Sequence, residues 1–176
     1  MEKKLNILKS FFEDPNKKFS IRELSRLIKT NHTTTRQHLN MLVKEKYLTL
    51  EKDRIYSFYQ LTNSKKTLNL KLYYNLEKIR KSKLIENLEQ KYDYPTIVLF
   101  GSYSTATNYK DSDIDICIIS DIKKIFALDK YEQVLNRKVS LHIYNNSSWD
   151  KLKKSNTYLV NNICNGIVLS GELSIL

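Results

Sequence analysis

Two aspartates that alternate with isoleucines are the residues of this sequence best suited to chemistry. Asp113 and Asp115 alternate with Ile114 and Ile116 and lead directly into the apolar segment 117–119. Because successive side chains of a β-strand point to opposite faces, the two carboxylates would share one face while the isoleucines point into the core. Carboxylates held this close repel each other unless a divalent cation lies between them. The pattern therefore predicts a site for Mg²⁺ or Mn²⁺, which prefer oxygen ligands.

A glycine and a serine precede these aspartates, at the end of another expected strand. Residues 96–100 form a short apolar run typical of a buried strand, and Gly101 and Ser102 follow at once. Glycine lets the backbone turn sharply and approach a phosphate closely, and serine adds a hydroxyl and a backbone N–H for that phosphate. Ser102 lies ten positions before Ser112, which begins the Ser-Asp-Ile-Asp segment. Together the two segments predict a metal-dependent phosphate site.

The segments 100–106 and 111–116 resemble the signature of the minimal nucleotidyltransferase domain of the DNA polymerase β-like superfamily. The resemblance covers residues 91–145. It implies transfer of a nucleoside monophosphate from an NTP to an acceptor hydroxyl, with pyrophosphate leaving and no covalent enzyme intermediate. It also implies which residues bind phosphate and which are catalytic and hold Mg²⁺ or Mn²⁺: Gly101, Ser102 and Ser112 for phosphate, Asp113 and Asp115 for the metal ions.

Two positions depart from the pattern of this family. The loop has Ala106 where the family commonly has a glycine that follows an arginine. A third carboxylate is expected on the strand 138–144, where it would help to hold a metal ion and act as base on the acceptor hydroxyl. Ser140 stands there instead, and His142 follows two residues later as either a substitute base or a polar residue of the strand surface. Two other carboxylates lie upstream in an expected helix and could take the role: Asp129 and Glu132.

The missing third carboxylate leaves more than one function open for the C-terminal half. The first is an active nucleotidyltransferase. The second is a DNA-binding transcription regulator whose C-terminal domain senses a nucleotide–metal complex without turning it over. A toxin–antitoxin type partner that modifies or masks another protein is a third interpretation, and in that case the acceptor is a protein.

The first half of the chain carries nearly all of the net positive charge. Residues 1–90 contain 20 Lys and Arg against 10 Asp and Glu, and residues 91–176 contain 10 against 9, within a formal net charge of +11. This asymmetry favours a polyanion such as double-stranded DNA as a partner of the N-terminal half. A solvated basic surface is the alternative.

The same half has the expected element order of a DNA-binding domain. Ser20 and Glu23 form a capping box at the start of a short amphipathic helix, and a second helix is expected from His32. Two short helices joined by a tight turn are typical of a helix-turn-helix. Two β-prone runs, 47–50 and 55–59, follow around a polar turn and predict a hairpin.

This order resembles the winged-helix domain of prokaryotic transcription regulators, with Lys46 in place of the glycine that many relatives have after the second helix. The resemblance implies that the second helix faces the major groove and that the wing reaches phosphates. The residues concerned are His32, Thr33, Thr34, Arg36, Gln37 and Asn40 in the helix, and Lys52 and Arg54 on the wing. Winged helices also bind proteins or RNA, and these partners remain alternatives.

The expected fold is α+β in three parts. Residues 1–62 form a winged helix-turn-helix, residues 63–92 a helical connector, and residues 93–176 a polymerase β-like nucleotidyltransferase domain with a mixed sheet. The whole chain resembles an archaeal family of winged-helix–nucleotidyltransferase fusions. The basic residues of the connector are either a solvated face or an extension of the nucleic-acid surface, and Tyr73 and Tyr74 could form a homodimer contact.

Composition excludes several other classes of protein. With only three glycines the chain has neither a dinucleotide fingerprint nor a P-loop. No apolar run approaches about 18 residues, so no membrane span is expected. Cys117 and Cys164 lack metal-ligand spacing and are expected as free thiols in the cytoplasm, with a disulfide as the alternative.

Overall fold

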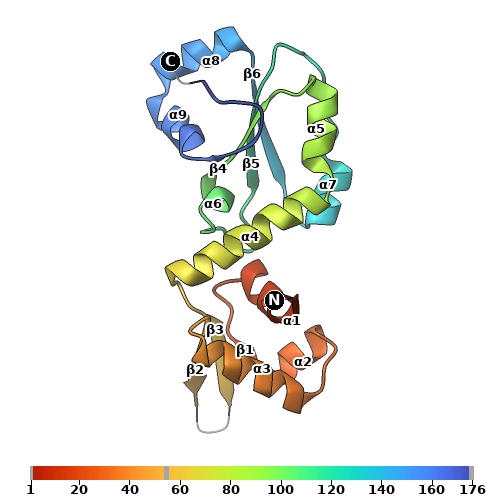
Figure 1. Cartoon of the computed structure of the whole chain (residues 1–176), viewed down its shortest axis with the longest axis vertical. Coiled ribbons are helices and arrows are strands. Elements are labelled where there is room, and N and C mark those ends of the chain that lie inside the picture. The colour runs from red at the N-terminus through yellow and green to blue at the C-terminus, as the bar shows by residue number, and fades with distance from the viewer. Residues whose placement is uncertain (1, 54–55, 175–176) are drawn as a thin grey trace. The chain divides into compact units, whose positions relative to one another are not determined.

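The computed structural model describes residues 2–53 and 56–174 and divides the chain into two compact units (Figure 1). Unit 1 comprises Met1–Tyr74 and unit 2 comprises Asn75–Leu176. The division falls inside the helix α4, Lys65–Lys81. The expected connector corresponds to this helix and to α5, Leu84–Tyr92.

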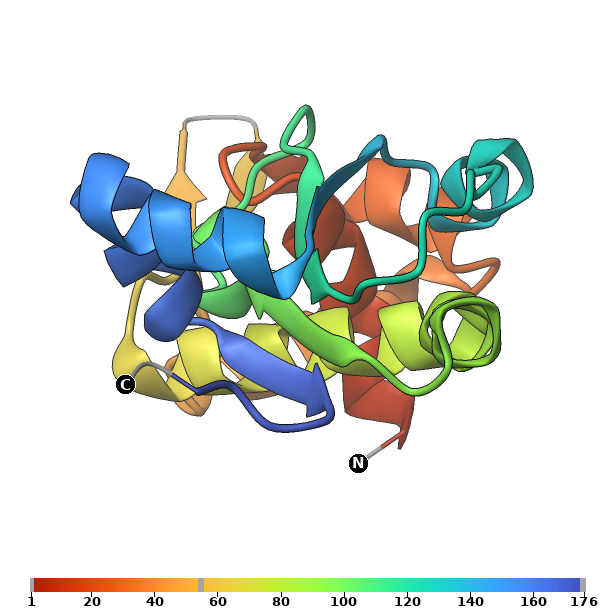
Figure 2. The same ribbon diagram turned by 90° about the horizontal axis from the view of Figure 1, so that it is seen from above.

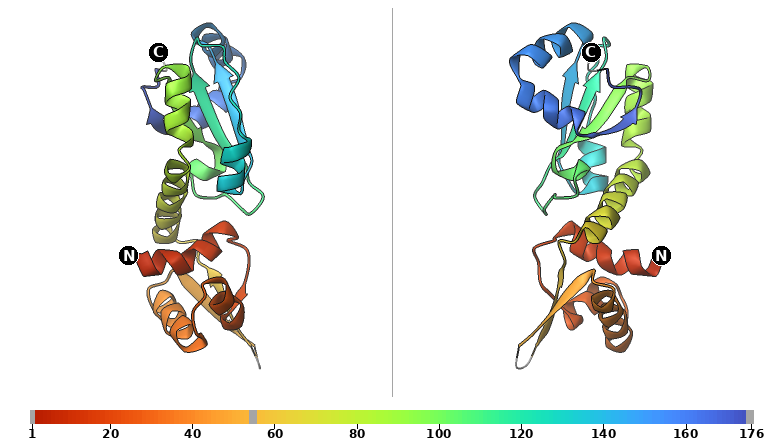
Figure 3. Two further views of the ribbon diagram at one scale, coloured as in Figure 1. Left: turned by 90° about the vertical axis from the view of Figure 1, so that its right-hand side faces the viewer. Right: turned by 60° about the vertical axis from the view of Figure 1, so that its left-hand side comes forward.

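Unit 1 combines three helices with a small antiparallel sheet before α4 begins. Its elements are α1 (Glu2–Glu13), β1 (Phe19–Ser20), α2 (Ile21–Leu27), α3 (His32–Lys44), β2 (Leu48–Lys52) and β3 (Ser57–Leu61). The sheet order is β1-β3-β2, and Leu48 pairs with Leu61 in the β2–β3 hairpin, which extends from the helices (Figure 3). The two predicted helices and the hairpin are therefore present, with each strand lying slightly later than its β-prone run.

Local hydrogen bonds define where α2 and α3 begin. The Ser20 hydroxyl accepts from the backbone N–H of Glu23 at 3.2 Å, as the predicted capping box requires. The Asn31 side chain accepts from the backbone N–H of Thr34 at 2.8 Å and so caps α3. Each of the two helices therefore begins next to a residue whose side chain caps its first turn.

Each of these helices is followed, two residues after its last residue, by a lysine whose backbone lies in the left-handed region. Lys29 has φ 52° and Lys46 has φ 63°. After α3, the N–H of Tyr47 donates to the carbonyl of Leu42 at 2.9 Å, and the N–H of Lys46 donates to that of Val43 at 2.9 Å. This is the Schellman arrangement, which usually has glycine at the left-handed position. Lys46 therefore adopts the conformation of the glycine that it replaces.

Aliphatic and aromatic side chains from every element of unit 1 form one core. The buried members are Ile7, Leu8, Phe11, Phe12, Phe19, Leu24, Leu39, Leu42, Tyr47, Leu48 and Tyr59. Tyr74 packs its ring against Phe12 and donates its hydroxyl to Glu13 at 2.6 Å, whereas Tyr73 is about half exposed. Of the two tyrosines considered for a homodimer contact, Tyr74 is thus engaged within unit 1.

Unit 2 is a four-stranded mixed sheet with helices on both faces. After α5 its elements are β4 (Thr96–Phe100), α6 (Gly101–Ser104), β5 (Ile114–Ile119), α7 (Asp129–Leu135), β6 (Val139–Tyr144), α8 (Asn146–Ser155), α9 (Thr157–Cys164) and β7 (Ile167–Ser170). The strand order is β6-β5-β4-β7, with β5 and β6 parallel and the other pairs antiparallel. This is the α+β organisation with a mixed C-terminal sheet that the sequence predicts.

Alternating side chains give the sheet of unit 2 two separate cores. Ile97, Leu99, Ile114, Ile116 and Ile118 face one core, which α5 and α7 cover. The intervening residues Val98, Phe100 and Cys117 face a second core with Trp149 of α8 and Ile163 of α9. Figure 2 shows α8 and α9 on one side of the sheet and α5 and α7 on the other. Ile114 and Ile116 are fully buried, which confirms that they point away from the face of Asp115.

A search of the helices in 2–53 and 56–174 finds none that is both long enough and apolar enough to cross a membrane. Within these ranges both cysteines are free thiols.

Replacing Lys46 by glycine is expected to raise the free energy of unfolding by about 0.5–1 kcal/mol. The left-handed conformation costs a side-chain-bearing residue about 1–2 kcal/mol, part of which the greater entropy of unfolded glycine offsets. Denaturant unfolding monitored by far-UV circular dichroism measures the change. Lys46→Ala removes the same exposed charge but keeps the Cβ atom, so an equal gain in that variant would contradict the explanation.

Cys117 is expected to resist alkylation in the folded protein at pH 8. Burial, together with the nearby Cys164, raises the pKa of its thiol to about 12, so almost no thiolate is present. Iodoacetamide labelling with and without guanidinium, followed by mass spectrometry, measures this. Labelling of Cys117 in the native protein as fast as in the unfolded chain would show that the thiol is accessible.

Candidate functional site

Asp115 lies at the centre of three neighbouring strands. In the β5 register it pairs with Phe100 on the antiparallel strand β4 and with Ser140 on the parallel strand β6. Its side chain shares the face of Cys117, toward α8 and α9, and remains partly exposed. The loop after β4 and the start of β6 therefore meet at this carboxylate.

The backbone of Gly101 packs directly against the carboxylate of Asp115. Gly101 has φ 69°, and a Cβ atom placed there would lie 2.5 Å from Asp115 Oδ2. That separation is shorter than a carbon and an oxygen tolerate without displacement. Glycine is required at this position both for its backbone conformation and for the approach of the loop to Asp115.

The loop that follows Gly101 is held by its own hydrogen bonds. The Ser104 hydroxyl donates to the Gly101 carbonyl at 2.8 Å, and the N–H of Thr107 donates to the Ser102 carbonyl at 3.0 Å. Ala106, where the family has glycine, adopts φ 59° and is 1% exposed. The alanine thus keeps a left-handed turn at this point of the loop, and Ser102 stays partly exposed beside Asp115's strand.

Two carboxylates and burial set the electrostatics of the site. Burial raises the pKa of Asp115, and the charge of Asp113 raises it further, whereas His142 lowers it. Asp113 is exposed at the start of β5. The repulsion between the two aspartates is the feature that a cation would relieve.

Ser140 and His142 lie on the same face of the sheet as Asp115. The Ser140 hydroxyl and His142 Nε2 are 3.3 Å apart, and His142 Nε2 is 4.0 Å from Asp115 Oδ1. The imidazole also contacts the ring of Phe100 edge-on, with the ring centroids 5.1 Å apart. The structure therefore places Ser140 beside Asp115 on the neighbouring strand, with His142 next to both.

Asp113 and Asp115 are the side chains of this site that would bind a divalent cation. Over 2–53 and 56–174, no group of three or more His, Cys, Asp and Glu side chains is arranged to hold a metal ion. Mg²⁺ is usually held by one or two carboxylates together with substrate phosphates and water, rather than by a cage of protein ligands. Asp113 and Asp115 would supply the two carboxylates of that pattern, and the charge of Asp113 raises the pKa of Asp115, as a neighbouring like charge does.

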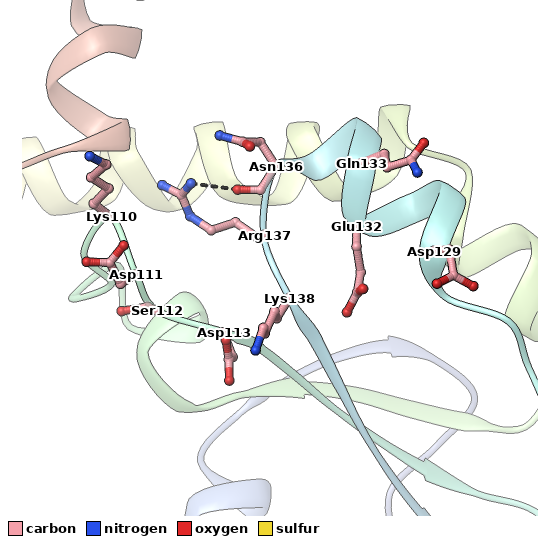
Figure 4. A pocket seen from close by; sticks show the side chains of 10 residues that line it. All are labelled: Lys110, Asp111, Ser112, Asp113, Asp129, Glu132, Gln133, Asn136, Arg137 and Lys138. Carbon is pink, nitrogen blue, oxygen red and sulfur yellow. Dashed lines mark hydrogen bonds between the residues drawn. The ribbon is translucent and has the colours of Figure 1, made fainter.

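A polar cavity of about 640 Å³ opens beside Asp113 (Figure 4). Its walls come from residues 110–113, from α7 and from residues 136–138 before β6. Side chains of both signs line it: Lys110, Asp111, Ser112, Asp113, Asp129, Glu132, Gln133, Asn136, Arg137 and Lys138. No local pattern in the sequence marks Lys110, Gln133 or the residues 136–138 as part of this cavity.

The two upstream carboxylates considered as substitutes line this cavity with Asp113. Glu132 Oε1 accepts a hydrogen bond from the backbone N–H of Val139 at 2.9 Å, so one of its oxygens fixes the start of β6. Asp129 is exposed at the first turn of α7. Ser112 also lines the cavity, but its hydroxyl accepts from the N–H of Tyr109 at 2.8 Å and closes a turn.

Most residues predicted to contact DNA lie on the exposed side of α3. His32, Thr33, Arg36, Gln37 and Asn40 are exposed there, and Thr34 is partly buried. The carboxamide oxygen of Asn40 accepts from the Tyr59 hydroxyl at 3.2 Å, which orients that side chain. Lys52 is exposed at the end of β2, and Arg54 lies outside the described residues.

Comparisons with known proteins bear on the C-terminal unit. A family model described as "Nucleotidyltransferase domain" matches residues 81–164. One solved structure that matches is a "Possible transcriptional regulator from Methanosarcina mazei Go1", with 18% identity, a TM-score of 0.36, and coverage of 51% of this chain and 78% of that chain. A comparison with curated proteins found no match. The matched segment runs from the end of α4 to the end of α9, so unit 2 contains a nucleotidyltransferase domain.

Proposed function

We propose that this protein transfers a nucleoside monophosphate from an NTP to an acceptor hydroxyl, and that its N-terminal unit is a winged helix-turn-helix that binds double-stranded DNA. The observation that carries the transferase proposal is the contact between Gly101 and Asp115 inside a nucleotidyltransferase domain. This arrangement supports a phosphate-binding role for the loop, because its first residue lies next to a carboxylate that could hold a cation.

The loop and the carboxylates would interact with different parts of the triphosphate. The backbone at Gly101 and the hydroxyl of Ser102 bind the phosphates that leave as pyrophosphate. Asp113 and Asp115 would hold Mg²⁺ or Mn²⁺, which when bound supplies positive charge to the attacked α-phosphate and to the leaving group. Asp115 already lies next to the backbone of the loop at Gly101. Binding of the nucleotide would therefore require little movement of either group.

The strand order supports an entry side for the acceptor. In-line displacement at phosphorus requires the attacking and leaving oxygens on opposite sides of the phosphorus atom. The loop follows β4, the carboxylates lie on or next to β5, and the cavity lies beside the start of β6, in the order β4-β5-β6 across the sheet. Asp115 faces the opposite side of the sheet from α7, so an acceptor in the cavity would reach the metal ions from the side of Asp113. Its oxygen bonds to the α-phosphorus as the bond to pyrophosphate breaks.

A nucleotide-sensing regulator without turnover is the second candidate. The observation that favours it is the pairing of Asp115 with Ser140, because a hydroxyl there can neither replace a carboxylate charge nor serve as an effective base. His142 is the remaining side chain beside Asp115 that could accept a proton. Transfer assays and binding assays separate the two candidates.

The DNA-binding proposal is supported by the exposed face of α3. Thr33, Arg36, Gln37 and Asn40 recur at the three- and four-residue spacing that places side chains on one side of a helix. Arginine and glutamine can read base edges in the major groove. Exposed basic side chains on α2 would add phosphate contacts: Arg22, Arg26 and Lys29, which follows the helix.

Replacing Asp113 or Asp115 by asparagine is expected to lower the rate of transfer by about a hundredfold or more, since charge stabilisation at the phosphate is lost. The assay supplies each α-³²P-labelled NTP with Mg²⁺, with total cell protein or total nucleic acid as acceptor, and follows label incorporation.

Asp150→Asn, which removes an exposed carboxylate on α8, is the matched control and should transfer at the rate of the unaltered protein. Label that no acceptor takes up, together with Mg²⁺-dependent NTP binding measured by calorimetry, would reject the transferase and support the sensor. Absence of both transfer and binding would reject both candidates.

Arg36→Ala is expected to weaken binding to a selected DNA site by about tenfold or more, as loss of a base contact typically does. Site selection from random duplexes followed by fluorescence anisotropy at several salt concentrations provides the measurement. The affinity should fall as salt rises, because phosphate contacts release counterions.

Lys9→Ala on α1 removes one exposed positive charge elsewhere in unit 1 and should change the affinity much less. An equal effect of the two substitutions would indicate non-specific charge attraction. Affinity independent of salt would count against phosphate contacts altogether.

A further inference from the structure

A buried amide on α4 holds the loop that carries Ser102. Asn75 is 1% exposed, although it is polar. Its Nδ2 donates to the backbone carbonyl of Tyr103 at 3.2 Å and to the Oδ1 atom of Asn108 at 2.9 Å. Figure 1 shows α6, which contains Tyr103, beside α4. One side chain therefore fastens the loop at two points.

These two points lie at the start and at the end of the segment that follows Gly101 and Ser102, the residues to which the proposed function assigns phosphate binding. Tyr103 directly follows Ser102, and Asn108 lies at the far end of the loop and is 2% exposed. The bonds of Ser104 and Thr107 described above join the loop only to itself. Asn75 instead joins the loop to a long helix that belongs to the core of unit 2 through Ile79.

The position of this loop matters because its backbone at Gly101 lies very close to the carboxylate of Asp115. A Cβ atom at Gly101 would lie 2.5 Å from Asp115 Oδ2, so the loop backbone and the carboxylate are in close contact. A shift of the loop by a fraction of an ångström would alter both the phosphate-binding groups and the environment of Asp115. Donors that bind phosphate are effective only when they are preorganised.

We propose that Asn75 is a positioning residue for the nucleotide site: its amide fixes the Gly101–Asn108 loop in the geometry that binds the phosphates of the NTP. The inference rests on the proposed nucleotide site, and Asn75 itself touches neither nucleotide nor metal. Two hydrogen bonds from a buried donor supply the restraint. No local pattern in the sequence identifies Asn75, whose partners lie 28 and 33 positions later in the chain.

The test compares Asn75→Ala and Asn75→Leu with a variant of similar stability. Alanine removes the donor and leaves space, whereas leucine removes the donor and fills the space with a somewhat larger side chain of the same branching, so a result common to both comes from the lost hydrogen bonds. Ile118→Val is the control, because Ile118 is fully buried in the same core and lies toward the opposite end of β5 from Asp115. Its lost methylene lowers stability without altering the loop.

The first readout is the kinetics of transfer, with calorimetric binding of Mg²⁺ and ATP where turnover is slow. For both Asn75 variants, KM or Kd for the NTP is expected to rise about tenfold while kcat changes less than about threefold, since the loop binds the phosphates before and during reaction. Ile118→Val should lower the melting temperature and leave the NTP affinity within about twofold of the starting protein.

The second readout is hydrogen exchange in peptides that cover residues 101–108, which needs no activity. Exchange of the loop amides, including that of Thr107, is expected to rise about tenfold in the Asn75 variants and to stay unchanged in Ile118→Val. Unchanged loop exchange would overturn the proposal. Faster exchange with unaltered NTP affinity would also overturn it, by reducing Asn75 to a structural role.

The two readouts separate failure of this inference from failure of the proposed function. If the starting protein binds and transfers no NTP, the proposed function fails, and with it the assignment of Asn75 to a nucleotide site, even where loop exchange rises as expected. If the starting protein binds NTP and both Asn75 variants bind it equally well, only the role of Asn75 fails.

Discussion

The close packing of the Gly101 backbone on the Asp115 carboxylate is the constraint on which the candidate site depends. It requires glycine, since a Cβ atom would lie 2.5 Å from Asp115 Oδ2 and φ is 69°. It also requires that Phe100 pair with Asp115, because any other register between β4 and β5 would move the loop along the strand. The site is therefore a consequence of strand pairing, and its precision comes from the sheet rather than from the loop alone.

Because successive side chains of a strand point to opposite faces of the sheet, a charged residue can lie on a strand whose neighbouring residues belong to apolar cores. On β5, Ile114, Ile116 and Ile118 enter the core covered by α5 and α7, so Asp115 must face the other side. There the buried atoms begin with Cys117 and Phe100, and Asp115 remains partly exposed near the edge of that second core. Burial raises the pKa of Asp115 while the side chain remains partly exposed, so a bound cation would favour its charged form.

The sequence was informative wherever chemistry and secondary structure follow from neighbouring residues. The alternation of residues 113–116 predicted the two faces of β5, and the run 138–144 predicted the strand β6, whose register with β5 pairs Ser140 with Asp115. Contacts between distant segments left no such pattern, and the hydrogen bond from Asn75 to the carbonyl of Tyr103, 28 positions later in the chain, is one of them. Lys46 is a different case, because Schellman hydrogen bonds impose a left-handed backbone on a residue whose type does not favour it.

Under the proposed function, the presence of Ser140 beside the two carboxylates of Asp113 and Asp115 affects how the cation and the nucleotide would bind. With Ser140 opposite Asp115, the protein supplies two anionic ligands, and phosphate oxygens must complete the coordination shell. A cation would then bind weakly without NTP, and NTP would bind weakly without the cation. Linkage requires that each raise the affinity of the other by the same factor. Loss of the third carboxylate would thus make the site more dependent on its substrate, and a transferase and a nucleotide sensor would share this dependence.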